Sequence, residues 1–238
     1  FEDGIAGFKP QSAQKVFQQK YGDCKGMANL TKTLLRLAGY DARLTWVGTN
    51  HLAYDYSIPS LAVDNHMVCT VLHDGKRYIL DATEKYNAFG DYAERIQGRP
   101  ILIENGKKYI LDKVPVLGNT RNLVIHNQLL KIEGGRLAGR GKLELSGENK
   151  QMLLYYLHKT PKIHRDRFIK GVISSRNENF EVLANKISNI HNREQPFEIN
   201  YLFKNPGQIT KFGREIYLDM DYSKEYKSAI NWSISKKL

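Results

Sequence analysis

The stretch Tyr21-Gly22-Asp23-Cys24-Lys25 places one of the two cysteines of the chain directly before an amphipathic helical pattern. Apolar residues follow it at spacings of three and four, which predicts a helix that begins near Cys24. Asp23 belongs to the residue types that cap helix N-termini, so Cys24 is expected in the first turn. The unpaired N–H groups and the positive end of the helix dipole favour a thiolate there.

A thiolate of low pKa is the form in which cysteine acts as a nucleophile at neutral pH. A free cysteine is nevertheless more often a small, buried core residue. Position alone therefore leaves two interpretations of Cys24 open, a nucleophile or a core residue.

The dipeptide Asp74-Gly75 lies between two strand-like runs and predicts a β-hairpin. With the turn centred there, Val68 lies opposite Asp81, and His66 lies diagonal to Asp81 on the same face. Diagonal neighbours are about 7–8 Å apart at the backbone, within reach of long side chains. A carboxylate so placed can fix the tautomer of a histidine that activates a nucleophile, unless a one-residue bulge reverses the parity.

The same alternation places Cys69 on the face opposite His66. If Cys24 contacts His66, we expect Cys24 and Cys69 on opposite sides of the sheet. Cys69 is therefore predicted to be a core residue, and a disulfide between the two cysteines is not expected.

The remaining pattern indicates an α+β protein with a boundary near residue 117, which gives domains 1–117 and 118–238. The first half is predicted to contain a helix at 12–20 and strands at 42–47, 66–72, 76–80, 101–104 and 108–111. The second half is predicted to contain strands at 123–132, 137–145, 197–203, 215–220 and 229–234 and helices at 148–158, 163–174 and 180–190.

The net charge of +11 belongs to the second half of the chain. Residues 1–100 hold 12 basic and 11 acidic side chains, so +10 remains for residues 101–238. The basic residues are scattered and form no nucleic-acid motif, which favours a solvated basic surface over nucleic-acid binding. No apolar run is long enough to span a bilayer, and no pair of histidines has the spacing of metal ligands.

Three motifs carry a family resemblance: Tyr21 to Gly26, Asn65-His66 and Tyr78 to Thr83. Together they resemble the core of the transglutaminase-like superfamily, over roughly residues 8–112. More narrowly, the chain is similar to a bacterial multidomain group, whose C-terminal flanking domain of unknown function the second half resembles. We expect the N-terminal flanking domain of that group to be missing from this chain. Gly26 departs from the many relatives that carry an acidic residue after the lysine.

The resemblance implies a papain-like fold, in which the helix that bears Cys24 packs on an antiparallel sheet, followed by a smaller, strand-rich α+β domain. It implies a triad of Cys24 as nucleophile, His66 as base and acid, and Asp81 as orienting carboxylate. The implied reaction is acyl transfer at an amide carbonyl through a thioester, without a cofactor. Water as acceptor makes the protein a cysteine peptidase or amidase, and an amine makes it a transglutaminase. The backbone N–H of Cys24 and a second donor would bind the oxyanion.

Five further residues are candidates for the oxyanion or substrate site: Gln18, Gln19, Tyr21, Tyr54 and Tyr56. A surface role for the two glutamines and strand packing for Tyr54 and Tyr56 are the alternatives. The resemblance also implies a peptide or protein substrate and export to the periplasm or cell envelope. The alternative function is a catalytically silent module that binds peptide or glycan in a cell-envelope assembly.

Overall fold

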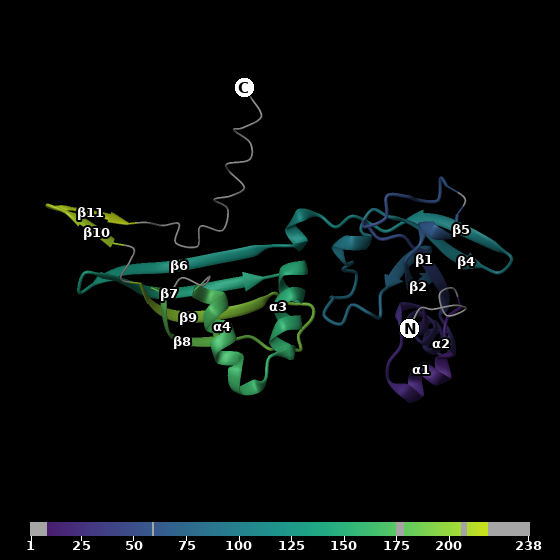
Figure 1. Cartoon of the computed structure of the whole chain (residues 1–238), viewed down its shortest axis with the longest axis horizontal. Coiled ribbons are helices and arrows are strands. Elements are labelled where there is room, and N and C mark those ends of the chain that lie inside the picture. The colour runs from purple at the N-terminus through teal and green to yellow at the C-terminus, as the bar shows by residue number, and fades with distance from the viewer. Residues whose placement is uncertain (1–8, 59, 175–178, 206–208, 219–238) are drawn as a thin grey trace, which may run out of the picture. The chain divides into compact units, whose positions relative to one another are not determined.

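The computed structural model describes residues 9–58, 60–174, 179–205 and 209–218. The chain divides into two compact units, residues 1–121 and 122–238 (Figure 1). The boundary that the sequence suggests, at residue 117, stays a prediction. None of the helices in the described ranges is long and apolar enough to cross a membrane.

Unit 1 is a mixed α+β domain built on an antiparallel five-stranded sheet with the strand order β3-β2-β1-β4-β5. Its elements follow one another as α1 (Ala13–Gln19), α2 (Cys24–Leu37), β1 (Asp41–Val47), η2 (Leu61–Val63), β2 (His66–His73), β3 (Lys76–Leu80), η3 (Glu94–Ile96), β4 (Pro100–Asn105), β5 (Lys108–Lys113) and η4 (Asn119–Arg121).

The start of α2 is fixed by a cap and by close packing against α1. The Asp23 carboxylate accepts a 2.7 Å hydrogen bond from the backbone N–H of Gly26, which makes Cys24 the first helical residue, as predicted. A Cβ at Gly26 would lie only 3.0 Å from Cγ2 of the buried Val16. The glycine that departs from the family pattern thus lets α1 approach the first turn of α2.

The β2–β3 hairpin has the register that the sequence predicts. Cys69 pairs with Leu80 and Thr70 with Ile79, without a bulge. The turn residues Asp74 and Gly75 have φ values of 49° and 72°, the left-handed conformation of a two-residue hairpin turn. The turn chemistry and the strand pattern therefore determine the pairing here.

The two faces of this sheet are covered by different elements. On one face, Val68 packs with residues of β4 and with Ile96 of η3. On the other face, Cys69 packs with Val71 and with Leu35 of α2. The prediction that Cys24 and Cys69 lie on opposite sides is therefore wrong, because the helix that begins at Cys24 covers the Cys69 face.

Unit 2 is also α+β and is rich in strands. Its four-stranded antiparallel sheet has the order β6-β7-β9-β8, and β10 and β11 form a separate hairpin. Its elements are β6 (Val124–Glu133), β7 (Arg136–Leu145), α3 (Gly147–Lys159), η5 (Lys162–His164), α4 (Arg165–Ser174), β8 (Glu181–Ile187), β9 (Phe197–Asn205), β10 (Ile209–Phe212) and β11 (Glu215–Leu218).

Both α3 and α4 lie against one face of the four-stranded sheet (Figure 1). Alternate residues of β9, beginning with Phe197 and Ile199, are buried on that face, and Leu154 and Ile169 are buried on the two helices. The other face of the sheet carries polar and charged side chains together with exposed apolar ones such as Leu129, as is possible for an antiparallel sheet with one uncovered side.

One predicted element of unit 2 has the wrong type, and another lies outside the described residues. The helix predicted at 180–190 is the strand β8, which pairs with β9 and contains a bulge between Val182 and Ala184. The short apolar run fits the side-chain period of a helix and that of a strand. It forms a strand because the edge of β9 is free to pair with it. The strand predicted at 229–234 lies outside the described residues.

Candidate active site

The Cys24 thiol lies in the first turn of α2, where several polar groups contact it. Burial raises the pKa of this thiol, but a hydrogen bond with the His66 side chain and one from the backbone N–H of Met67 lower it. The positive charges of His66 and Lys25 lower it further, so its pKa lies below the ordinary value of a thiol. The arrangement therefore favours a thiolate.

Lys25 brings its charge to the thiol because it is held in place by Asp23. Its ammonium group lies 2.8 Å from the Asp23 carboxylate, and the residue is only 4 % exposed. Burial raises the pKa of Asp23, yet Lys25 and the N–H of Gly26 lower it to below its usual range. The Asp23 carboxylate therefore caps α2 and also holds the charged Lys25 side chain beside the nucleophile.

The His66 ring joins the thiol to Asp81. Nε2 of His66 lies 2.7 Å from Oδ2 of Asp81, and both side chains are buried. Burial lowers the pKa of His66, but the hydrogen bonds and charges of Asp81 and Cys24 outweigh burial and raise it to about 9. His66 and Asp81 therefore meet across the diagonal of the hairpin that the predicted register gives.

The Asp81 carboxylate is held by two further residues. Its Oδ1 accepts hydrogen bonds from the backbone N–H of Thr83, 2.9 Å, and from the Thr83 hydroxyl, 2.6 Å. Its Oδ2 lies 3.4 Å from a guanidinium nitrogen of Arg95, which also pairs with Glu84. Burial raises the pKa of Asp81, and the bonds from His66 and Thr83 lower it to a net value below the ordinary one.

Cys24 and His66 meet at the end of β2, although α2 covers the Cys69 face. His66 is the first residue of the strand, so the sheet does not continue beyond it to separate the two faces. The preceding residue, Asn65, fixes this end, because its side chain accepts from the N–H of Thr49 and donates to the Thr49 hydroxyl, each at 2.9 Å. The strand end therefore allows the ring to contact both the helix start and Asp81.

The structure brings Cys24, His66 and Asp81 together and places the five other candidates differently. Gln18 and Gln19 are exposed on α1. Tyr21 and Tyr54 are both about half exposed. The carbonyl of Tyr54 accepts a 2.7 Å hydrogen bond from Arg99.

Tyr56 is half-buried in a turn and does not lie on a strand, so strand packing does not describe it. Its hydroxyl is hydrogen-bonded to the carboxylate of Asp64 and lies 3.0 Å from the carbonyl of Trp46. Burial raises the pKa of Tyr56, and the nearby Asp64 carboxylate raises it further. These bonds connect the long loop before β2 to β1.

Sequence reasoning missed three residues that contact the triad. The sequence shows Lys25 only as the neighbour of Cys24, and the backbone N–H of Met67 carries no sequence signal. Arg95 lies 14 positions beyond Asp81, in the short helix η3 that the sequence does not predict, so no spacing rule indicates it. No group of three or more His, Cys, Asp or Glu side chains that could hold a metal occurs among the residues that the structure describes.

Comparison with known proteins finds a match to one family, in the first part of the chain. Residues 3–80 match the family model of the transglutaminase-like superfamily. This range contains Cys24 and His66 and ends one residue before Asp81. No curated protein and no solved structure matches the chain.

Proposed function

Because residues 3–80 form a domain of the transglutaminase-like superfamily, for which a papain-like fold is expected, we propose that this chain is a thiol-dependent acyltransferase. In this proposal Cys24 attacks an amide carbonyl, His66 moves the protons, and Asp81 orients His66. Water is the preferred acceptor, which makes the protein a cysteine peptidase or amidase acting on a peptide or protein.

The continuous contact from Cys24 through His66 to Asp81 is the observation that supports this proposal. The pKa of the thiol is lowered and that of the imidazole is raised to about 9. Between these two pKa values the pair exists as thiolate and imidazolium, so nucleophile and acid are both ready. A structural cysteine does not require such a partner.

The chemistry follows from this charged pair. The Cys24 sulfur bonds to the carbonyl carbon, and His66 gives its proton to the amide nitrogen as the C–N bond breaks. The amine leaves and a thioester remains on Cys24. Neutral His66 then takes a proton from water, whose oxygen attacks the thioester carbon, and the carboxylic acid leaves with the thiolate restored. An incoming amine in place of water gives transglutamination.

The oxyanion formed in each step requires hydrogen-bond donors. The backbone N–H of Cys24 is in the first turn of α2, where N–H groups have no carbonyl partner within the helix. The N-terminal position therefore supplies one donor together with the positive end of the helix dipole. This assignment needs no side chain from the five exposed or loop candidates.

The test compares two matched variants of the full chain, Cys24→Ala and Cys69→Ala. Hydrolysis of a quenched-fluorescent peptide library and transfer of a fluorescent amine to casein are measured side by side. Cys24→Ala should lose at least about a thousandfold of the rate in whichever assay responds, because no nucleophile remains. Cys69→Ala should retain activity in proportion to the folded fraction.

Equal activity of wild type and Cys24→Ala would overturn the proposal. Binding of peptide that is unchanged by Cys24→Ala, in a wild type that turns over no substrate, would support the silent binding module instead. The ratio of hydrolysis to amine transfer decides between water and amine as acceptor.

A further inference from the structure

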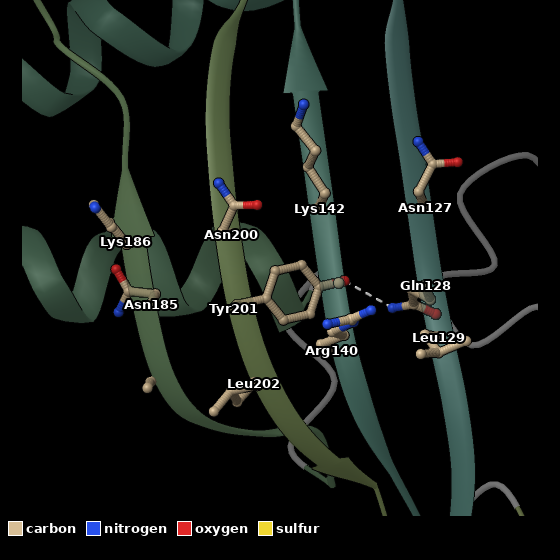
Figure 2. A pocket seen from close by; sticks show the side chains of 12 residues that line it. Asn127, Gln128, Leu129, Arg140, Lys142, Asn185, Lys186, Asn200, Tyr201 and Leu202 are labelled. Atoms are coloured by element: carbon tan, nitrogen blue, oxygen red, sulfur yellow. Dashed lines mark hydrogen bonds between the residues drawn. The ribbon is translucent and has the colours of Figure 1, made fainter.

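The uncovered face of the four-stranded sheet of unit 2 contains a groove that the proposed chemistry does not use. Its volume is about 650 Å³, and it is lined by side chains from all four strands, β6, β7, β8 and β9 (Figure 2). Helical ribbon lies behind the sheet in this view, on the side away from the labelled row of side chains. The groove therefore lies on the face of the sheet that the helices do not cover, which we call the polar face.

The strand register aligns a polar row across this groove. Lys186 of β8 pairs with Asn200 of β9, Asn200 pairs with Lys142 of β7, and Lys142 pairs with Asn127 of β6. Figure 2 shows the four side chains side by side at the same level of the sheet. Since adjacent strands lie about 4.8 Å apart, the row extends about 14 Å across the strands.

A second row, two residues further along the strands, is mostly apolar. It consists of Ala184, Leu202, Arg140 and Leu129, again in paired register. Leu202 is 50 % exposed and Leu129 is 62 % exposed, on either side of the Arg140 guanidinium. The groove thus combines a polar edge with two apolar contact points.

Two of the three cations in the groove are available to a ligand. Lys142 is paired with two carboxylates, Glu144 at 3.0 Å and Glu198 at 2.8 Å, so its charge is not available to a ligand. Arg140 and Lys186 form no ion pair or hydrogen bond with any residue in the described parts of the chain, and both are exposed. Their unpaired charge is complementary to carboxylates.

The two asparagines add a different recognition chemistry. The side chains of Asn127 and Asn200 are exposed and form no hydrogen bond within the described residues. Each offers an N–H₂ donor and a carbonyl acceptor, the pair of groups that matches a peptide backbone amide.

We propose that this groove binds an extended acidic peptide segment. Arg140 and Lys186 bind carboxylates of the peptide, and Asn127 and Asn200 bind its backbone amides. Leu129 and Leu202 contact one of its apolar side chains, since neighbouring side chains of an extended peptide point in alternate directions. This binding does not depend on the chemistry proposed for unit 1.

The groove is less suited to other anionic polymers. Glu144 and Glu198 form the row next to the polar row. A nucleic acid carries a phosphate at every nucleotide and would place some of them against these carboxylates, whereas a peptide can place its carboxylates near Arg140 and Lys186 and uncharged residues near Glu144 and Glu198. Tyr201, the aromatic residue of the lining, lies on the opposite face, where its ring fills the space of the missing Gly141 side chain. Its hydroxyl accepts a 2.7 Å hydrogen bond from Gln128, so the ring is unavailable as a platform for a sugar (Figure 2).

Fluorescence anisotropy of the full chain tests the proposal with a short fluorescein-labelled peptide of glutamate, leucine and glycine. A peptide of the same length with glutamine in place of glutamate is the control ligand. The acidic peptide should bind and the glutamine peptide should bind at least about tenfold more weakly. The variant Arg140→Gln/Lys186→Gln should lose about tenfold in affinity for the acidic peptide, since two exposed charge pairs are removed.

A matched control variant separates the groove from general charge. Arg167→Gln/Lys162→Gln removes the same two charge types from exposed positions of α4 and η5 and should bind as the wild type does. Equal losses in both double variants, equal binding of the two peptides, or no binding by the wild type would each overturn the proposal. Tighter binding of a labelled polyuronate or of single-stranded DNA than of the acidic peptide would also contradict it.

Discussion

Cys24 is the first residue of α2, and Cys69 lies on the sheet face against which Leu35 of α2 packs, yet the two thiols have opposite chemistry. Cys69 is fully buried among apolar side chains. Cys24 lies where α2 begins and β2 begins. The fold thus places one cysteine among apolar groups and the other among hydrogen-bonding groups.

Burial raises the pKa of both thiols, so burial alone does not distinguish them. At Cys69 it dominates and raises the pKa to about 11. At Cys24 the bonds with His66 and the Met67 N–H, together with the charge of Lys25, reverse it. The activated cysteine is the one at the end of a secondary-structure element. There the backbone N–H groups and the side chains at the strand end are free to contact the thiol.

The largest expected difference is in alkylation by iodoacetamide. At pH 7 a thiol with a pKa near 11 is about one part in ten thousand thiolate, and Cys69 is also inaccessible. Cys24 should therefore be alkylated at least about a thousandfold faster, as measured by peptide mass spectrometry over time. Comparable alkylation rates in the folded chain would contradict the activation of Cys24 relative to Cys69.

Unfolding provides the control for this experiment. In denaturant the two cysteines lose their surroundings and should react at similar rates. The variant His66→Ala should slow the alkylation of Cys24 in the folded chain, because the main group that lowers the pKa of the thiol is removed. An unchanged rate would show that the helix start alone activates Cys24.

The second expected effect is a shift of the pH profile in Asp81→Asn. Burial lowers the pKa of His66, but Asp81 and Cys24 together raise it to about 9. Acylation by the wild type should therefore decline as the pH rises through about 9 and the imidazolium loses its proton. Removal of the carboxylate lowers the pKa of His66, which moves this alkaline limb to lower pH. The rate at neutral pH should fall about a hundredfold, measured as kcat/KM on the peptide substrate.

Thr83→Val serves as the control for Asp81→Asn. It removes one hydrogen bond to Oδ1 and leaves the charge and the bond to His66. The alkaline limb should stay within a few tenths of a pH unit of the wild type. A limb that moves as far in Thr83→Val as in Asp81→Asn would mean that orientation, and not charge, sets the pKa of His66.

Arg95→Gln should have a smaller effect with the opposite sign. Arg95 lies 3.4 Å from Asp81 and brings a positive charge towards the triad. Its removal favours the imidazolium, so the alkaline limb should move to higher pH while kcat falls less than about tenfold. Loss of activity with the limb moving to lower pH would contradict this role and indicate that Arg95 keeps Asp81 in place.

The sequence predicted most of unit 1 because its signals are local. The cap at Asp23, the amphipathic pattern of α2 and the Asp74-Gly75 turn act over a few residues, and together they place Cys24, His66 and Asp81. The side of the sheet covered by α2 is a tertiary choice that alternation within one strand does not determine. The prediction for the position of Cys69 relative to Cys24 was therefore wrong, although Cys69 is a core residue as expected.

In unit 2 the errors also arise where partners are distant in sequence. The sequence predicts a helix at 180–190, but β8 forms there because the edge of β9 is available to it. The groove side chains Arg140 and Lys186 come from β7 and β8, so only the strand register brings them to one surface. Charge counting located the basic half but not this groove.

The smallest expected effect concerns the packing of α1 against the first turn of α2, which positions Cys24. An alanine at Gly26 would bring its Cβ to 3.0 Å from Val16, whereas an alanine at Gly171, within α4, would meet nothing within 4 Å. Gly171→Ala should raise the free energy of unfolding by about 1 kcal/mol, the usual gain of alanine over glycine in a helix. Gly26→Ala should gain less or lose stability, since Val16 must move.

The double variant Val16→Ala/Gly26→Ala decides whether Val16 is the cause. With the valine truncated, Gly26→Ala should recover most of the gain of about 1 kcal/mol in urea unfolding, relative to Val16→Ala alone. If it does not, another feature of the first turn, such as the Asp23 cap, requires glycine. Because Cys24 is in this turn, a shift of α2 against α1 should also change its alkylation rate, and an unchanged rate would show that the site tolerates the movement.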